Sequence, residues 1–353
     1  MKPISIIYGT RPEAIKMAPI IKEFKNRGVV TRVISTGQHQ DLLTDIEKDL
    51  AITPDIRLSC FKDGSSLSSL LARVINGLEP HIADSSMVIV QGDTTSALGG
   101  AIACMHSKIP LAHVEAGLRS GDINSPHPEE GNRLLIDSIS DICFAPTKEA
   151  RDVLIKEGKN PKSVFLTGNT EVDSVLSVFD MDYTLAIASN YHNIVVTLHR
   201  RENFDRAPEI AKELASIGNP YNILVISHPN PTGKRFKEAL LAENASVIFL
   251  PPVGFKDMVN LVGKSWLVLT DSGGLVEDCL TLHVPCGILR TETERMEAVK
   301  CGGAELVLGK VARFVSRLQV GKNHIEMAAC SNPFGDGFAA KRIVEKVIEA
   351  VSR

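Results

Sequence analysis

The sequence predicts an α/β fold built from two doubly wound, Rossmann-like domains. Short apolar runs alternate with helical patterns from Ile4 to Thr167, and such alternation indicates βαβ units with a parallel sheet. The pattern loosens between Glu171 and Asn193 and then restarts, so we place a domain junction there. A chain of 353 residues is long enough for two domains that each bury a core.

The first half contains several runs with the length and composition of buried strands. We expect these strands at Ile4–Tyr8, Val30–Ser35, Met87–Val90, Ile109–Val114, Ile142–Ala145 and Val164–Thr167. Helical patterns lie between them, at Ala14–Asn26, Leu42–Leu50, Leu67–Gly77 and Glu149–Glu157. The first helix follows a turn that contains Pro12, and proline suits the first helical turn because its missing N–H costs nothing there.

The second half repeats the alternation. We expect strands at Ile194–Leu198, Ile223–Ile226, Val247–Leu250, Trp266–Thr270 and Gly287–Leu289, and a closing helix at Phe338–Val351. The predicted domains are 1–175 and 190–335, with the helix in 336–353 packing back on the first domain. We expect the domains to face each other across a cleft, a preferred location for small-molecule sites.

Composition excludes several classes of function. The net charge is 39 − 42 = −3, which argues against a general nucleic-acid binder. No apolar run approaches the roughly 20 residues of a membrane helix. The N-terminal residues run straight into a strand, unlike a signal peptide. The seven scattered cysteines contain no CxxC, so we expect a reduced, cytoplasmic protein without a disulfide framework or metal site.

Acidic residues follow two of the predicted strands. Asp93 comes after Met87–Val90, Glu115 comes directly after Ile109–Val114, and Glu129-Glu130 follow in a proline-flanked loop. Ligands of open parallel sheets bind at the carboxyl ends of the strands, so these carboxylates are candidate acid–base groups. Asp93 has an equally good alternative as the N-cap of a helix that starts at Thr94.

Basic residues occupy similar positions. Arg11 lies beside a helix N-terminus, where a cation opposes the helix dipole, so it more plausibly serves a bound anion than solvent. His199 ends a predicted strand beside two arginines, and its usual pKa range suits proton transfer near neutral pH. His228 is a similar but weaker candidate.

Ser272-Gly273-Gly274 follow a strand and open a probable helix. Glycines at a helix N-terminus let a phosphate approach backbone N–H groups closely. One turn later, Glu277 and Asp278 are candidates for binding ribose hydroxyls. The alternative is a tight turn with an ordinary N-cap.

Together these segments resemble the non-hydrolysing UDP-N-acetylglucosamine 2-epimerases. The resemblance rests on GTRPEAIKMAP, TGQH, GDTTSAL, HVEAGLRS, SPHPEEGNR, LTGNTEVD, TLHRREN, LTDSGG, TERMEAV and NPFGDGFAAKRI, in the family's order along nearly the whole chain. It implies the two-domain glycosyltransferase-B fold. It also implies interconversion of UDP-GlcNAc and UDP-ManNAc, with no cofactor and no metal.

The resemblance assigns roles to individual residues. The catalytic candidates it implies are Asp93, Glu115, Glu129 and His199. The substrate-binding candidates it implies are Arg11, Lys16, Arg133, His228, Phe255, Ser272, Gly273, Gly274, Glu277 and Asp278. The sequence departs from the family's GGIQEE at Val276 and Asp278, and Phe255 replaces a tyrosine near the uracil.

The expected activity is therefore isomerisation of a UDP-sugar by elimination of UDP and re-addition with inversion at C2. The alternatives are a hydrolysing epimerase that releases ManNAc and UDP, a glycosyltransferase on the same fold, and a non-catalytic sugar-nucleotide sensor. The partner is a small-molecule UDP-sugar rather than a nucleic acid or a membrane, and we expect a homodimer.

Overall fold

The strands form two sheets in which every observed pairing is parallel. The computed structural model describes residues 2–38, 40–184, 192–218 and 220–352. Contacts divide the chain into unit 1, Met1–Ser174 with Phe334–Arg353, and unit 2, Val175–Pro333. The predicted junction at 171–193 includes 185–191, and the TGQH motif after the second predicted strand includes His39; these residues lie outside the described part.

The sheet of unit 1 has the strand order β3-β2-β1-β4-β5-β6-β7. Its strands are β1 (Ile4–Tyr8), β2 (Thr31–Ser35), β3 (Ile56–Arg57), β4 (Met87–Gln91), β5 (Leu111–Val114), β6 (Ile142–Ala145) and β7 (Val164–Leu166). The order reverses direction between β1 and β4, which is the switch point where ligands of doubly wound sheets bind. β1 and β4 are buried along their whole length, as expected for strands with both faces covered.

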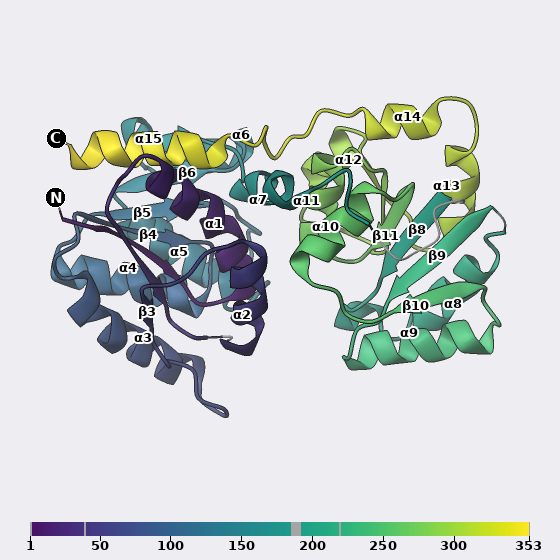
Figure 1. The fold of residues 1–353 in the computed structure, drawn as a ribbon, viewed down its shortest axis with the longest axis horizontal. Helices are drawn as coiled ribbons and strands as arrows, with labels where there is room; N and C mark the ends of the chain where they lie inside the picture. The colour runs from purple at the N-terminus through teal and green to yellow at the C-terminus, as the bar shows by residue number, and fades with distance from the viewer. Residues whose placement is uncertain (1, 39, 185–191, 219, 353) are drawn as a thin grey trace. The chain divides into compact units, whose positions relative to one another are not determined.

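Helices connect these strands and surround the sheet (Figure 1). They are α1 (Arg11–Asn26), α2 (Gln40–Asp49), α3 (Leu67–Ile82), α4 (Thr95–Ser107), α5 (Glu129–Ile139), α6 (Lys148–Lys156), η1 (Pro161–Ser163), α7 (Thr170–Val178) and α15 (Ala339–Val351). α15, yellow in Figure 1, ends the chain yet packs against α1 near its beginning. The Asp173 carboxylate accepts hydrogen bonds from the backbone N–H groups of Ala339 and Ala340 and so anchors the first turn of α15.

The sheet of unit 2 has the order β10-β9-β8-β11-β12-β13. Its strands are β8 (His192–Thr197), β9 (Tyr221–Ile226), β10 (Val247–Leu250), β11 (Leu267–Thr270), β12 (Cys286–Ile288) and β13 (Ala304–Leu306). Its helices are η2 (Arg201–Asn203), α8 (Ala207–Ala215), α9 (Pro231–Ala242), α10 (Phe255–Gly263), α11 (Gly273–Thr281), α12 (Met296–Lys300), α13 (Val311–Leu318) and α14 (Asn323–Ala328).

Each unit has its own apolar core. In unit 1, strand side chains such as Val88 and Val90 pack against Val74 and Leu78 of α3. In unit 2, strand and helix side chains such as Ile194, Leu214 and Leu267 form a separate cluster. Burial of a Val, Leu or Ile side chain contributes about 1.5–3 kcal/mol, so these clusters supply the main force that holds the strand ends in place.

The predicted α/β class with two parallel, doubly wound sheets is confirmed. Several details of the sequence prediction were wrong. Glu129 and Glu130 begin α5 rather than lying in a loop. α1 starts at Arg11 rather than Ala14, because Thr10 and Glu13 form a capping box around the first turn. β3 and β13 were not predicted, because two- and three-residue strands are too short to show a pattern. Among the described residues, no helix is long and apolar enough to cross a membrane.

Candidate active site

Glu115 is the first residue after β5 and adopts an unusual backbone conformation. Its φ is +67°, the left-handed region that residues with a Cβ atom rarely enter. Holding a residue there costs on the order of 1–3 kcal/mol and is most often found at functional sites. Its carboxylate accepts a hydrogen bond from Lys16 Nζ at 2.6 Å and another from the Gln91 side-chain amide at the end of β4. The turn therefore holds a carboxylate at the edge of the sheet.

Asp93 follows β4, which is the neighbour of β5. Its Oδ2 lies 2.6 Å from Arg133 Nη2, and its carbonyl accepts a 2.5 Å hydrogen bond from the Asn132 side chain. The alternative role of Asp93 as a helix cap was wrong, since α4 begins at Thr95 and Thr94 caps it by accepting from the Ala97 N–H at 3.0 Å. The carboxylate of Asp93 is thus held by a cation rather than by the helix.

The adjacent residues Glu129 and Glu130 open α5 but have different surroundings. Glu130 is buried and accepts hydrogen bonds from the Ser120 and Gly121 backbone N–H groups and from Arg133. Burial disfavours its charge, but these donors outweigh burial and hold the pKa of Glu130 below its usual value. Glu129 Oε2 is also buried, yet it accepts no hydrogen bond within the described part of the chain. Such an oxygen is unusual and is often completed by a ligand or water.

Two further residues of unit 1 lie at the exit of β1. Arg11 begins α1 and forms no ion pair in the described part of the chain, which leaves its guanidinium available to an anion. Glu13 is buried and receives the Gly9 and Thr10 backbone N–H groups and the Thr94 hydroxyl. Burial raises the pKa of Glu13 to about 7 despite these donors. The sequence prediction missed this role of Glu13, for which the Thr-x-x-Glu capping pattern was the available signal.

In unit 2, a histidine pair lies at the exits of β8 and β9. The His199 and His228 rings stack with their centroids 5.2 Å apart. His199 Nδ1 lies 3.0 Å from the Asp271 carboxylate, which also accepts the backbone N–H groups of His199 and Arg200. Asp271 is buried, but hydrogen bonding and charge from His199 outweigh burial and lower the pKa of Asp271. Burial and the neighbouring charge of His199 lower the pKa of His228. Asp271 fixes the His199 ring through Nδ1.

α11 starts at Gly273, directly after Asp271 and Ser272. Ser272 is its N-cap residue but makes no side-chain cap hydrogen bond. A Cβ atom added to Gly274 would meet nothing within 4 Å, whereas one added to Gly273 would lie 2.7 Å from Glu294 Oε1. The first turn of α11 is therefore open at Gly274, as the approach of a phosphate to backbone N–H groups requires.

The remaining predicted residues of unit 2 are buried near this helix or start a neighbouring one. The Glu277 carboxylate accepts a hydrogen bond from Arg295 Nε, and Asp278 is buried beside it in α11. Phe255 is buried at the first position of α10. Arg295 was not predicted, although its place in the TERMEAV segment was a signal that could have identified it.

A network of charges at the exit of β12 was also not predicted. Arg290 donates to Glu202 and to Glu294, each at 2.6 Å, and Arg200 lies 3.1 Å from Glu294. Burial opposes the charge of Glu294, but its own backbone N–H and the arginines lower its pKa to about 2. Glu294 therefore stays ionised beside Gly273 at any ordinary pH.

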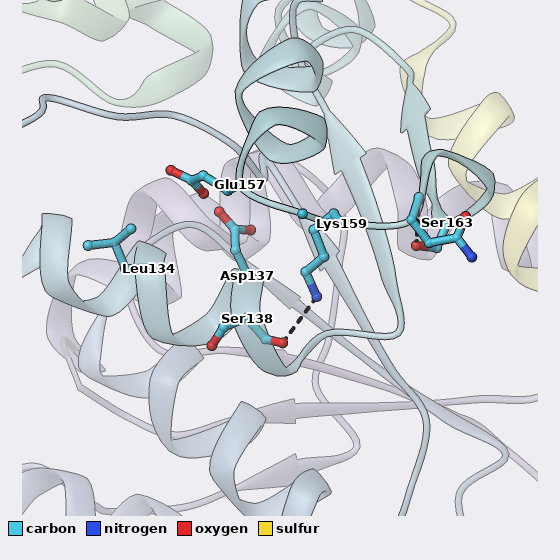
Figure 2. A pocket seen from close by; sticks show the side chains of 8 residues that line it. Leu134, Asp137, Ser138, Glu157, Lys159 and Ser163 are labelled. Carbon is cyan, nitrogen blue, oxygen red and sulfur yellow. Dashed lines mark hydrogen bonds between the residues drawn. The ribbon is translucent and has the colours of Figure 1, made fainter.

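A cavity of about 700 Å³ in unit 1 lies away from these residues. Its walls come from α5, through Leu134, Asp137 and Ser138, and from the segment 157–163. Figure 2 shows Lys159 reaching across it to the Ser138 carbonyl, 3.2 Å away. None of the predicted site residues lines this cavity. In the described residues, no group of histidine, cysteine or acidic side chains is arranged to hold a metal ion.

The structure brings the predicted residues together as two clusters, one per unit. The cluster of unit 1 contains Lys16, Asp93, Glu115 and Arg133, with Arg11 and Glu129 on the adjoining helix starts. The cluster of unit 2 contains His199 and His228, with Ser272, Gly273 and Gly274 following the β11 exit that holds His199. The first cluster combines three carboxylates with three basic side chains, and the second combines two histidines with an open helix start.

Comparison with known proteins identifies relatives along the whole chain. Residues 22–348 match a family model described as UDP-N-acetylglucosamine 2-epimerase. The UDP-N-acetylglucosamine 2-epimerase of Escherichia coli (strain K12) is 37% identical over 362 residues, 96% of each chain. The structure of UDP-GlcNAc 2-epimerase from Neisseria meningitidis bound to UDP-GlcNAc is 32% identical with a TM-score of 0.88, covering 99% of this chain and 100% of that one. The S. aureus MnaA–UDP co-structure is 34% identical with a TM-score of 0.87, covering 100% and 97%.

Proposed function

Since this chain belongs to the UDP-N-acetylglucosamine 2-epimerase family, we propose that it interconverts UDP-GlcNAc and UDP-ManNAc without hydrolysing them. The observation that carries the proposal is the group of carboxylates in unit 1. Asp93 and Glu115 leave neighbouring strands, and Glu129 presents a buried oxygen without a partner in the described residues. Inversion at a carbon requires acid–base groups of this kind.

The chemistry explains why elimination is a better route than direct proton exchange. The C2 proton of a hexosamine is not next to a carbonyl, so its removal alone would leave an unstabilised carbanion. When a base removes this proton, the C2–H electrons form the C1=C2 double bond and the C1–O bond breaks. UDP leaves with that electron pair, and 2-acetamidoglucal remains. Re-addition of UDP to C1 and of a proton to the opposite face of C2 gives the epimer.

We assign the proton transfers to Asp93, Glu115 and Glu129. Lys16 and Arg133 form ion pairs with two of these carboxylates and so hold them in place and balance their charge. Protonation of the face opposite to removal requires at least two acid–base groups around C2. The presence of more than one carboxylate at neighbouring strand exits supports this assignment.

We assign UDP to unit 2. The open first turn of α11 at Gly274 supports a role in binding the diphosphate through backbone N–H groups. His199, held through Nδ1 by Asp271, neutralises the departing diphosphate in this proposal. The S. aureus and N. meningitidis structures contain UDP and UDP-GlcNAc, which supports a nucleotide-sugar as the substrate class.

The test is NMR of the protein with UDP-GlcNAc in D2O. We expect UDP-ManNAc with deuterium at C2, because an exchangeable acid returns the proton. Product that keeps its original C2 hydrogen would exclude this mechanism. Free ManNAc as the main product would identify the hydrolysing reaction. Substrate that is unchanged until an acceptor is added would identify a glycosyltransferase, and binding without any turnover would identify a sensor.

We also propose that the protein is a homodimer, as expected from its sequence. Light scattering of the purified chain after size-exclusion chromatography should give twice the monomer mass of 38.3 kDa. A monomer mass over the concentration range of the activity assay would contradict this.

A further inference from the structure

A buried histidine lies behind the two carboxylates that leave β4 and β5. His113 is in the middle of β5, and its side chain is fully buried. Its Nδ1 lies 2.6 Å from Asp137 Oδ1, and its Nε2 lies 2.9 Å from the Gly92 carbonyl oxygen. The other side chains of β5 are apolar, so a polar group here is not needed to fill the core.

The partners determine which protons the ring carries. A backbone carbonyl only accepts, so His113 Nε2 must donate to Gly92. Asp137 is buried, but the charge and hydrogen bond of His113 together with Arg119 outweigh burial and lower the pKa of Asp137. His113 Nδ1 faces Asp137 Oδ1 at hydrogen-bond distance, so both ring nitrogens of His113 have a fixed partner.

These hydrogen bonds restrain two turns at once. Gly92, with φ of +74°, precedes Asp93, and its carbonyl is held by His113. Asp137 Oδ2 accepts the Gly117 N–H at 3.1 Å, just after Glu115. Glu115 thus lies between two residues, His113 and Gly117, that both bind Asp137. This arrangement explains how a strained, left-handed Glu115 is kept in place.

The cluster around Asp137 also contains ion pairs. Arg119 lies 2.8 Å from Asp137 Oδ2 and also donates to Glu157, so Asp137 is paired with a cation as well as with His113. Buried ion pairs seldom add stability over well-packed apolar residues, because the cost of removing charges from water offsets their attraction. A role in orienting other groups accounts for the cluster better than stability does.

We propose that His113, held by Asp137, is the positioning residue that fixes the β4 and β5 exits and so aims Asp93 and Glu115 at the substrate. The inference rests on the function proposed above and deepens it. His113 touches no substrate in this account. It acts through the Gly92 carbonyl and through Asp137.

Two neutral variants separate the two hydrogen bonds. In His113→Asn, the side-chain amide can reach Asp137 but not Gly92, while in His113→Gln it can reach the Gly92 carbonyl. A displacement of about 1 Å in an active site can cost about 10²-fold in rate. We expect His113→Asn to lower kcat by about that factor, with KM and UDP affinity within about twofold of wild type. His113→Gln should restore at least a tenth of the wild-type kcat.

Ser138→Ala is the matched control. Ser138 is next to Asp137 on α5 and lines the same cavity (Figure 2), but its hydroxyl donates only to the Leu135 carbonyl. Its kcat should equal that of wild type. Wild-type kcat in His113→Asn would overturn the inference while the proposed function stands. If the wild-type protein did not epimerise UDP-GlcNAc, both the proposed function and the proposed role of His113 would be wrong.

A measurement on the wild-type protein tests the geometry without any variant. With ¹⁵N-labelled histidine, NMR at neutral pH should show one ring whose Nε2 proton exchanges slowly, because the buried Nε2 of His113 donates to the Gly92 carbonyl. Protons on His199, whose side chain is one-third exposed, should exchange faster. If no ring in the spectrum had a protected Nε2 proton, the hydrogen bond from His113 to Gly92 would be excluded and the inference would fail.

Discussion

The six strands of the unit 2 sheet follow the same order as the first six strands of unit 1, yet the helices after equivalent strands start differently. β1 and β4 of unit 1 occupy the places of β8 and β11 of unit 2. After β4, Thr94 caps α4 with its own hydroxyl, whereas after β11, Ser272 leaves α11 without a side-chain cap. A capped start is closed to a ligand and an uncapped start is open. In the function proposed above, an anion therefore binds at the helix start after β11 and not at the helix start after β4.

Each unit also has a buried carboxylate that ties down the turn after its first strand. Glu13 accepts the Gly9 and Thr10 N–H groups, and Asp271 accepts those of His199 and Arg200. Glu13 has hydroxyl partners and a raised pKa, while Asp271 has a histidine partner and a lowered one. The comparison teaches that the fold sets the place of the carboxylate, and its neighbours set its chemistry.

The largest expected effect tests whether the acid–base groups belong to unit 1. Glu115→Gln keeps the shape of the side chain but cannot take a proton, so the epimerisation rate should fall about 10²–10⁴-fold. UDP affinity, measured by calorimetry, should stay within about twofold, since UDP is assigned to unit 2. Glu129→Gln should behave in the same way.

Glu349→Gln is the control, because the exposed Glu349 pairs with Lys346 on α15 and lies in neither cluster. Its rate should not change. If Glu115→Gln lowered UDP affinity as much as the rate, the division of labour between the units would be wrong.

The next prediction compares how stability depends on pH at the two buried carboxylates, Glu13 and Asp271. The pKa of Glu13 is about 7 in the folded chain against 4.5 ordinarily, so the folded form binds more protons between these values. Stability near Glu13 should therefore fall as pH rises from 4.5 to 7, by at most about 3.5 kcal/mol at about 1.4 kcal/mol per unit. The pKa of Asp271 is lowered, so its contribution is present above about pH 4 and is lost as pH falls through the folded value.

Hydrogen exchange of peptides from the two turns measures both trends separately. In Glu13→Gln, the stability of the β1–α1 turn should depend less on pH between 4.5 and 7. In Asp271→Asn, the β8–η2 turn should no longer lose stability as the pH falls. If stability changed with pH in the same direction in both turns, the predicted difference between Glu13 and Asp271 would be wrong.

A third effect concerns the open start of α11. Gly274→Val places a side chain in open space, so the protein should fold while the approach of a phosphate is blocked. UDP affinity should fall about 10- to 100-fold, or about 1.4–2.7 kcal/mol. Gly273→Val is a less specific test, because its Cβ atom would also displace the Glu294 side chain.

Gly218→Val is the matched control, since a Cβ atom there also meets nothing within 4 Å. UDP affinity should be that of wild type in this variant. Undiminished binding in Gly274→Val would put the phosphate site elsewhere.

The residues that follow the strands could be predicted from the sequence, whereas the contacts between residues on different elements could not. Asp93, Glu115 and His199 could be found because a strand end follows from a local apolar run. The difference between Glu129 and Glu130 could not, since adjacent helical residues point about 100° apart and only the packing of α5 decides which one is enclosed by Ser120 and Gly121.

His113 and Asp137 show a second limit. Their contact joins residues 24 positions apart on different elements, and no local pattern encodes it. The available signal was a polar residue inside an otherwise apolar strand, two positions before Glu115. Such a residue indicates a buried partner without saying which one.

The smallest effect sharpens the contrast between the two helix starts. Thr94→Ala removes the α4 cap and the hydroxyl that donates to Glu13. The free energy of unfolding of unit 1 should therefore fall by about 1 kcal/mol, a typical value for a cap. Ser272→Ala removes no cap, so the stability of unit 2 should change by less than about 0.5 kcal/mol. If the Ser272 hydroxyl donates to a phosphate, UDP affinity should fall about two- to tenfold, the range of one hydrogen bond. Hydrogen exchange of α4 and α11 and calorimetry with UDP measure these quantities. Lower stability of α11 in Ser272→Ala with unchanged UDP affinity would mean that Ser272 serves the helix, and that the two starts differ less in function than in geometry.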